Sequence, residues 1–426
     1  MPRARHGMSP AGEGDLARAL YLHVPFCVRR CRYCDFATCA VSCDDPLVGA
    51  YEAALSRTAE RLASAGLLSG VCTAYVGGGT PSIATAPLAG LVGAVGRLCP
   101  RLGELTCEAN PDSLSPEASR ILASSGVGRV SLGVQSLADP ELRRLGRVHD
   151  ASRARAAARG VVDAGMRLSC DLMCAIPLQT PESLALSIDG VLECGAGHVS
   201  VYPLTVEDGT PLARACEAGE EAYPDDDFEA DLMELAARAL QSHGLARYEV
   251  ASYALPGQRC AHNEAYWTGV PYLGVGTSAA SMLTPGGYGM LREALPLLEV
   301  CAEDETLSHD ETDVARVRLT MVDPPRDFVR AVDSGGRLRV EVETLTTREA
   351  VAEDMMLSLR MTEGMSPELV GRGRSCGMGA ALDRAIERAT GDGLAERAAD
   401  GSIVPTRRGW LLGNELYGLF WGLAHD

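Results

Sequence analysis

The stretch YLHVPFCVRRCRYCDF, residues 21–36, places three cysteines at Cys27, Cys31 and Cys34, a C-x3-C-x2-C spacing. Three thiolates this close together can bind three irons of one [4Fe–4S] cluster, which leaves the fourth iron open to a small molecule. The run YLHV alternates apolar and polar residues and ends at Pro25, so we read it as a strand that stops before the cysteines. We therefore expect the cysteines on a loop at the carboxyl end of a strand, where α/β folds place their sites.

Two other interpretations of this cysteine trio stay open from the spacing alone. The chain has 15 cysteines, so such a spacing can arise by chance. A structural zinc site is the second interpretation, and it needs a fourth ligand, for which Cys39 or Cys43 is close enough in sequence. The positive charges of Arg29, Arg30 and Arg32 favour thiolates and offset an anionic cluster.

Length and charge limit the class of protein. A chain of 426 residues is too long for one ordinary domain but suits one large barrel and a smaller domain. The net charge of −18 argues against nucleic-acid binding and leaves at most peripheral membrane association, because both need basic surface. Residues 1–19 lack an apolar signal segment, no run of 18 apolar residues occurs, and the cysteines lack a framework spacing. We expect a reducing, cytoplasmic compartment.

Strands and helices alternate along the first part of the chain. The patterns predict strands at 21–24, 73–78, 104–111, 128–136, 167–177 and 198–205. They predict helices at 46–67, 115–125, 150–164, 181–194 and 227–243, and one that opens at Pro81. About six strands, each followed by a helix or loop, are typical of an α/β parallel barrel, complete or partial. Residues 206–226 look like an acidic excursion, and 246–254 like one more strand.

Changes in composition and periodicity along the sequence predict four segments. We expect a flexible N-terminus over residues 1–18, the barrel with its extension over 19–282, and an irregular connection over 283–344. The remainder, 345–426, reads as a small C-terminal α+β domain. Helical patterns at 348–364 and 378–394, followed by a strand, a turn and a helix at 401–420, indicate a winged-helix-like arrangement. Its acidity argues against DNA binding.

Polar residues at the ends of successive strands indicate a ligand pocket. Glycines 77–79 follow a strand and let the backbone approach a ligand closely, although a lone run of glycines is most often only a tight turn. Glu108, Gln135, Arg147 and Asp171 follow or end the next strands, and each alone is most often a cap or a loop residue. Together they favour a pocket in which carboxylates suit ribose hydroxyls and Arg147 suits a carboxylate.

Seven segments in this order resemble one known family. They are YLHVPFCVRRCRYCDF, YVGGGTPS, CEANP, GVGRVSLGVQSL with LRRLGRVHD, DLMCAIPLQT, HVSVYPLTVEDGTPL and HNEAYWTGVPYLGVGTSA. The chain resembles radical S-adenosylmethionine (radical SAM) proteins of the oxygen-independent coproporphyrinogen oxidase-like group. The resemblance covers residues 20–280 closely and 345–420 more loosely.

The resemblance implies a partial (β/α)6 TIM-type radical SAM barrel with a [4Fe–4S] cluster on Cys27, Cys31 and Cys34. S-adenosylmethionine would chelate the open iron, and an electron from a donor of the flavodoxin or ferredoxin class would cleave it to methionine and a 5′-deoxyadenosyl radical. The positions that match the family's cofactor contacts are Tyr21, Tyr33, Gly78, Gly79, Thr80, Glu108, Gln135, Arg147 and Asp171.

Within this group the chain resembles the heme chaperone branch. The decarboxylating oxidase has a further cysteine two residues after the third ligand, where this chain has Phe36. The heme chaperone branch carries H-N-x-x-Y-W, which stands intact here as His262, Asn263, Tyr266 and Trp267. Physically, imidazole is a good axial ligand for heme, and Tyr and Trp offer flat amphipathic surfaces. Without the resemblance, a core histidine in a turn is the simpler interpretation.

The resemblance therefore implies heme as cargo and apo-hemoproteins, such as respiratory enzymes, as acceptors. The open alternative is an enzyme of porphyrin biosynthesis that oxidatively decarboxylates coproporphyrinogen III to protoporphyrinogen IX. One departure from the family is Cys174–Ala175, where a glycine is usual. We expect this departure to crowd the pocket slightly without loss of the cofactor. Cys39 and Cys43 lie outside the cysteine motif, and we interpret them as incidental thiols.

Overall fold

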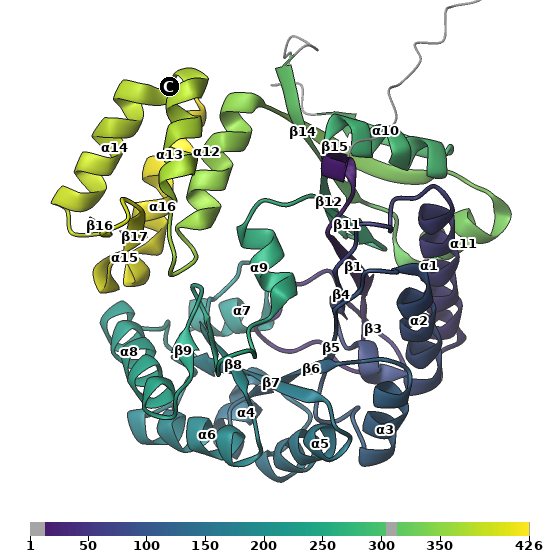
Figure 1. Ribbon diagram of the computed structural model, residues 1–426. Helices are drawn as coiled ribbons and strands as arrows, with labels where there is room; N and C mark the ends of the chain where they lie inside the picture. The colour runs from purple at the N-terminus through teal and green to yellow at the C-terminus, as the bar shows by residue number, and fades with distance from the viewer. Residues whose placement is uncertain (1–12, 304–312, 426) are drawn as a thin grey trace, which may run out of the picture.

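A single curved sheet runs through the computed structural model, which describes residues 13–303 and 313–425 (Figure 1). In this part of the chain its 13 strands follow the order β13 (Leu298–Glu303), β15 (Leu338–Thr346), β14 (Val314–Met321), β12 (Ala280–Leu283), β11 (Tyr272–Val275), β1 (Ala19–Val24), β4 (Thr73–Gly78), β5 (Glu104–Ala109), β6 (Arg129–Gln135), β7 (Arg167–Cys174), β8 (His198–Pro203), β10 (Ser252–Ala254) and β9 (Ala246–Arg247). The strands from β1 to β8 are mutually parallel. This run of parallel strands, followed by helices, confirms the predicted α/β fold.

Helices follow the parallel strands along the outside of the sheet (Figure 1). They are α1 (Pro46–Ser64), α2 (Thr85–Leu98), α3 (Pro116–Ser124), α4 (Asp139–Leu145), α5 (Ala151–Asp163), α6 (Pro181–Glu193) and α8 (Asp226–Ser242). Several begin at a side-chain cap, as at Asp45, Ser115 and Asp150. The predicted helix start at Pro81 is wrong by one turn. Residues 81–83 form a short 3-10 helix, and α2 begins at Thr85.

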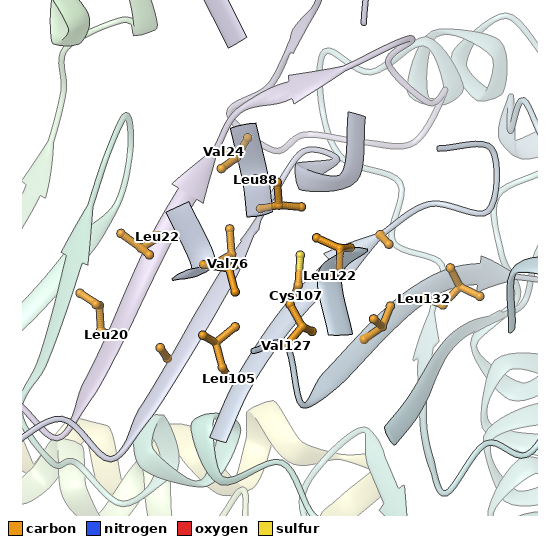
Figure 2. Close-up of a cluster of buried hydrophobic side chains, with 14 of the residues drawn as sticks. Leu20, Leu22, Val24, Val76, Leu88, Leu105, Cys107, Leu122, Val127 and Leu132 are labelled. Carbon is orange, nitrogen blue, oxygen red and sulfur yellow. The ribbon is translucent and has the colours of Figure 1, made fainter. Parts of the chain in front are cut away.

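The core lies between the outer face of the sheet and these helices. Leu20, Leu22 and Val24 alternate along β1 and are fully buried, as is Val76 on β4. Figure 2 shows these side chains with Leu88, Leu105, Cys107, Leu122, Val127 and Leu132 in one apolar layer. Since successive side chains on a strand point to opposite faces, the residues between them point into the lumen of the half-barrel.

Residues 283–344, expected as an irregular connection, are instead mostly regular. Beyond β12 they form α10 (Pro285–Ala294), β13, β14, α11 (Pro325–Ser334) and most of β15, and β14 pairs antiparallel with both β12 and β15. The glycines and proline at 285–287 misled the prediction. They open α10 after the Thr284 cap, and a Cβ on Gly287 would lie 2.7 Å from the Asp15 carbonyl oxygen. Residues 304–312 of this expectation lie outside the described residues.

The segment between β8 and β11 also differs from its prediction. The acidic excursion 206–226 contains α7 (Pro211–Glu217), capped by Thr210. The single strand expected at 246–254 is a hairpin of β9 and β10, because the chain turns between Tyr248 and Ser252. Helix α9 (Ala261–Trp267) then lies between the sheet and the C-terminal helices (Figure 1).

The C-terminal residues build a second hydrophobic cluster around Met355, Leu382, Ile403 and Phe420. The elements there are α12 (Thr347–Ser358), α13 (Pro367–Gly373), a π-turn (Arg374–Met378), α14 (Gly379–Gly391), the antiparallel ribbon β16 (Ala395–Arg397) and β17 (Ile403–Pro405), α15 (Arg407–Leu411) and α16 (Gly413–Trp421). Helix α12 ends at Ser358, one and a half turns before the predicted end. At the other terminus, residues 1–12 of the expected flexible segment lie outside the described residues, and Ala17 is already buried.

A buried ion cluster fastens α12 to β14. Arg316 donates to Glu353 at 2.9 Å and pairs with Asp354, while Arg318 also pairs with Glu353. Arg316 additionally donates to the carbonyl oxygen of Gly269 at 3.4 Å, just after α9. Both carboxylates are largely buried, and Arg372 also reaches Asp354 at 3.1 Å, but Arg316 is the guanidinium that contacts both of them, so its loss weakens the charge balance of the buried cluster.

We predict that Arg316→Leu lowers the free energy of unfolding by about 3 kcal/mol, since it removes one partner of a buried pair. Arg337→Leu is the matched control, because the Arg337–Glu299 pair lies at the surface, and its cost stays below about 1 kcal/mol. Urea denaturation of both variants measures the difference. Equal costs would show that the ion cluster does not stabilise this junction.

Candidate functional site

The lumen of the half-barrel is a cavity of about 570 Å³. Its wall is a row of polar side chains on neighbouring strands, formed by Thr106, Ser131, Ser169 and Ser200. Further lining residues come from the cysteine loop, the strand ends and α9. The volume falls within the range of roughly 300–1,000 Å³ that small-molecule sites occupy.

The three cysteines of the opening motif lie together at one end of this cavity. Cys27, Cys31 and Cys34 all line it, whereas Cys43 is exposed and the Cys39 thiol donates to the carbonyl oxygen of Pro25. The loop fits closely over the glycine turn after β4. A Cβ on Gly79 would lie 2.6 Å from the Phe26 carbonyl oxygen and 3.0 Å from Cys27 Sγ, so a side chain there would collide with the loop.

Two side chains donate to the cysteine sulfurs. Thr80 Oγ1 donates to Cys27 Sγ at 3.5 Å, and Arg147 Nη1 donates to Cys31 Sγ at 3.4 Å. Burial still raises the pKa of the Cys27 thiol to about 11. A metal or cluster bound here would therefore displace protons from the sulfurs.

Arg147 is held in place by the neighbouring strand ends. Its Nη2 donates to Asn110 Oδ1 and to the Gly133 carbonyl oxygen, both at 2.6 Å, and its buried Nε has no partner among the described residues. This Nε therefore remains as a donor for the carboxylate that the sequence led us to expect. Thr80 is buried behind the loop and does not line the cavity, whereas Tyr33 lines it beside Arg147.

Two carboxylates lie in the wall below the cysteines. Glu108 accepts from the Gly78 amide at 2.8 Å and from the Tyr75 hydroxyl at 3.0 Å. Burial raises the pKa of Glu108 to about 7, and the charge of Asp171 adds to the effect. Asp171 accepts from Ser131 Oγ at 3.0 Å, and burial raises its pKa to about 6. A bound cation or hydroxyl group would keep these carboxylates ionised.

The backbone at the rim of the cavity is strained in two places. Gln135, which lines the cavity, has φ of 65° at a register shift between β6 and β7. Ala175 has φ of 61°, in the left-handed region that favours glycine. Ala175 does not line the cavity, so the departure from the family's glycine affects the backbone and does not crowd the site.

Helix α9 is anchored at the opposite end of the strands by a buried ion pair. Arg129, at the start of β6, pairs with Glu104 at 3.1 Å and donates to the carbonyl oxygens of Gln258 and Arg259 at 2.8 Å. Glu104 in turn accepts from the backbone amide of His262 at 3.2 Å. These contacts hold the first turn of α9 against the amino ends of the strands.

His262 projects from α9 into the cavity. Its ring stacks on Tyr75 with centroids 5.1 Å apart and meets the edge of Tyr266 at 5.1 Å. Nδ1 hydrogen-bonds to Thr73 Oγ1 at 3.1 Å, and the buried Nε2 has no partner among the described residues. Burial lowers the pKa of His262 to about 3, so the imidazole is neutral at pH 7 and Nε2 or Nδ1 offers a lone pair.

The four residues of the HNEAYW motif do not all face the same space. His262, Asn263 and Tyr266 line the central cavity, together with Tyr21 and Tyr75. Trp267 lies outside it, where its ring packs against Arg360 of the C-terminal unit. The predicted heme residues are therefore divided between the lumen and an outer surface of α9.

The sequence analysis missed several lining residues. They are Tyr75, Thr106, Asn110, Arg129, Ser131, Ser169, His198, Ser200 and Tyr202. The sequence does contain a pattern that could have identified them. ELTCEA, RVSLGVQ and HVSVYP alternate polar with apolar residues along whole strands, which places a row of polar side chains on one face of the sheet. The expectations considered only strand ends, where Glu108 and Gln135 do stand, whereas Asp171, also expected at an end, lies in the middle of β7.

The residues present suit the cofactors that this type of fold implies. Three thiols that line the same end of the cavity, a close-fitting glycine turn and two hydrogen-bond donors to sulfur are appropriate for an anionic iron–sulfur cluster, although among the described residues the three thiols are not close enough together to hold a single metal ion. The buried carboxylates and the polar strand wall suit the charged and hydroxyl groups of S-adenosylmethionine.

Comparison with known proteins places the fold in a class. The model of the radical SAM superfamily matches residues 21–189. The solved structure of the coproporphyrinogen III oxidase HemN from Escherichia coli, a radical SAM enzyme, superposes with a TM-score of 0.72, over 95% of this chain and 90% of that chain. Its identity of 20% shows the fold alone. The architecture is therefore that of a radical SAM protein.

Closer relatives narrow the assignment. The heme chaperone HemW of Mycobacterium tuberculosis is 35% identical over 405 residues, which cover 92% of this chain and 92% of the relative. HemW of Bacillus subtilis is 30% identical over 418 residues, covering 95% of this chain and 99% of the relative. The chain belongs to the HemW family of radical SAM proteins. Among its described helices, none combines the length and apolarity needed to cross a bilayer.

We predict that Glu108 makes stability depend on pH. Its pKa is about 7 in the fold against 4.5 in a free chain, so its contribution is fully present below pH 4.5 and is lost as pH rises through 7. Glu108→Gln should therefore gain about 3 kcal/mol relative to the wild type between pH 4 and pH 8. Urea denaturation across this range measures the gain. Glu60→Gln, at an exposed site on α1, is the control, and parallel pH profiles for wild type and Glu108→Gln would contradict the prediction.

Proposed function

We propose that this protein binds heme and passes it to apo-hemoproteins, such as respiratory enzymes, in the cytoplasm. In this proposal Cys27, Cys31 and Cys34 hold a [4Fe–4S] cluster, and S-adenosylmethionine occupies the adjoining part of the cavity. A donor of the flavodoxin or ferredoxin class reduces the cluster. The relatives named heme chaperone HemW support the heme part, and the radical SAM family supports the cluster and S-adenosylmethionine.

One observation carries the heme proposal most directly. His262 presents a buried, unpartnered Nε2 in the cavity, while Thr73 holds Nδ1. A neutral imidazole with one nitrogen hydrogen-bonded and the other free is the usual state of a histidine that ligates a metal. The stacked Tyr75 and the edge-on Tyr266 restrict the rotation of the ring.

The cavity residues have distinct proposed tasks toward S-adenosylmethionine. Glu108 and Asp171 accept from its hydroxyl or ammonium groups, Gly78 and Gly79 allow close approach, and the Nε of Arg147 donates to its carboxylate. Tyr21, Tyr33 and Gln135 line the same space, and Thr80 supports the cysteine loop from behind. When bound and reduced, the cluster supplies the electron that cleaves the sulfonium.

The alternative, coproporphyrinogen III oxidation, has less support from this chain. Phe36 stands where the decarboxylating oxidase has its further cysteine, and its side chain is 62% exposed at the mouth of the cavity. An anaerobic assay for protoporphyrinogen IX on a reconstituted and reduced sample decides the point. Product formation would replace the chaperone proposal with the enzyme.

We predict that Cys31→Ala abolishes the iron and inorganic sulfide that the wild type takes up on anaerobic reconstitution, because a cluster needs all three thiolates. Iron, sulfide and zinc analysis of the purified protein measures the loss. Cys43→Ala, an exposed cysteine outside the motif, is the matched control and should retain the wild-type content. A zinc-containing wild type without sulfide would contradict the proposal.

We predict that His262→Ala weakens heme binding at least about tenfold, because the axial ligand is lost. His262→Phe, which fills the same space without a nitrogen, should give the same loss and so separates ligation from packing. Spectrophotometric heme titration measures both variants, and exposed His243→Ala is the control. Wild-type affinity in both His262 variants would remove the motif from the heme site.

A further inference from the structure

The acidic excursion after β8 contacts the cysteine loop with the carboxylate of Glu221. Its Oε1 accepts from Arg144 Nη1 at 2.9 Å and from Arg32 Nη1 at 3.3 Å. The Glu221 side chain is only 8% exposed, whereas both arginine side chains are partly exposed. Arg32 lies between Cys31 and Cys34 in the sequence. One buried carboxylate is therefore joined to the segment that carries two of the three cysteines.

Arg32 is also held by its backbone. Its amide donates to the carbonyl oxygen of Leu145, at the end of α4, at 3.0 Å, and its carbonyl oxygen accepts from the amide of Leu212, in α7, at 2.8 Å. Its guanidinium donates in addition to the carbonyl oxygen of Arg144 at 3.2 Å. A Cβ on Gly146 would lie 2.9 Å from Arg32 Cγ, so the turn after α4 leaves room for the arginine because it has no side chain. Both α4 and α7 therefore bind this one residue of the loop.

Apolar packing adds to these polar contacts. Tyr33, next to Arg32, packs against a small hydrophobic cluster that includes Leu145 of α4 and Leu212 and Cys216 of α7. This cluster is separate from the main core of the barrel. The excursion that contains α7 is therefore packed against the cysteine loop by both polar and apolar contacts.

The end of α7 fixes the place of Glu221. The chain turns back at Gly219, where φ is 72°, and the amides of Glu220 and Glu221 both donate to the carbonyl oxygen of Ala215, at 2.9 and 3.2 Å. Glu221 is thereby placed against the two arginines, whereas Glu220 is exposed. Two neighbouring carboxylates therefore differ in whether they contact the loop.

We propose that Glu221 is a positioning residue for the iron–sulfur cluster and acts through Arg32 on the segment that carries Cys31 and Cys34. A loop loses conformational freedom when it binds a cluster, and a loop that is already fixed loses less. The carboxylate that accepts from both guanidinium groups holds this segment between α4 and α7. This inference rests on the proposed function, because it gives the acidic excursion a task toward the cluster.

The first test uses the full chain without a cluster. Anaerobic alkylation with iodoacetamide, followed by peptide mass spectrometry, measures the reactivity of each thiol. Glu221→Gln should raise the rates at Cys31 and Cys34 about fivefold, the factor that loss of a partly exposed ion pair allows. The rate at the exposed Cys43 should not change. Glu220→Gln is the matched control, because it removes the same charge one residue away, and it should leave all of these rates unchanged.

A double variant shows whether Glu221 acts through Arg32. Arg32→Gln alone should raise the rates at Cys31 and Cys34 at least about fivefold. Adding Glu221→Gln to it should change them by less than about twofold, because the interaction between the two residues is already lost. Multiplied effects in the double variant would overturn the route through Arg32. Unchanged rates in Glu221→Gln, or an equal rise at Cys43, would overturn the inference as a whole.

The second test uses the reconstituted protein. Iron release to an added chelator should be about fivefold faster in Glu221→Gln than in the wild type. Glu234→Gln is the control for a merely structural role, because Glu234 also pairs with two arginines, Arg238 and Arg407, but joins α8 to α15. It should release iron at the wild-type rate.

The two tests separate this inference from the proposed function. Equal iron release in Glu221→Gln and Glu234→Gln, or faster alkylation without faster iron release, would overturn the link between Glu221 and the cluster. If the wild type takes up no iron and sulfide, the proposed function fails in its cluster part. The alkylation rates then still decide whether Glu221 holds the loop, because they need no cluster.

Discussion

The buried pair of Arg129 and Glu104 is the interaction on which the arrangement of the site depends. An arginine that is 1% exposed needs hydrogen-bond partners, and its two terminal nitrogens find Glu104 and the two carbonyl oxygens just before α9, while Nε has no partner among the described residues. The chain that returns from β10 is thereby held under the amino ends of the strands. His262 follows directly, with its backbone amide on Glu104, so the same ion pair holds the helix start that carries its ring.

This anchor gives the half-barrel two functional ends. The cysteine loop lies over the carboxyl ends of β1 and β4, whereas His262 reaches Thr73 at the amino end of β4. The rings of Tyr21 and Tyr75 lie between them, stacked with centroids 6.2 Å apart. Tyr75 touches both regions, since its hydroxyl donates to Glu108 and its ring stacks on His262. A change in the carboxylate region can therefore reach the histidine through one side chain.

The C-terminal unit contacts the barrel at α9 and β14. The parallel strands stop at β8, and α9 lies between the sheet and the C-terminal helices (Figure 1). The C-terminal helices then face α9 from outside, where Trp267, Arg360 and Tyr417 stack. The ion cluster around Arg316 joins the same unit to β14 and to the end of α9.

The sequence by itself determined the class of fold, the cysteine loop and most of the cavity rim, because these depend on local patterns. Alternation along each strand and the spacing of Cys27, Cys31 and Cys34 are readable without neighbours. Only the tertiary structure decided how α9 divides its motif, how the 283–344 segment joins the sheet, and where Arg360 lies. Each of these depends on contacts between residues far apart in the chain, such as Arg129 with Gln258, and no local pattern encodes which distant partner a polar side chain finds.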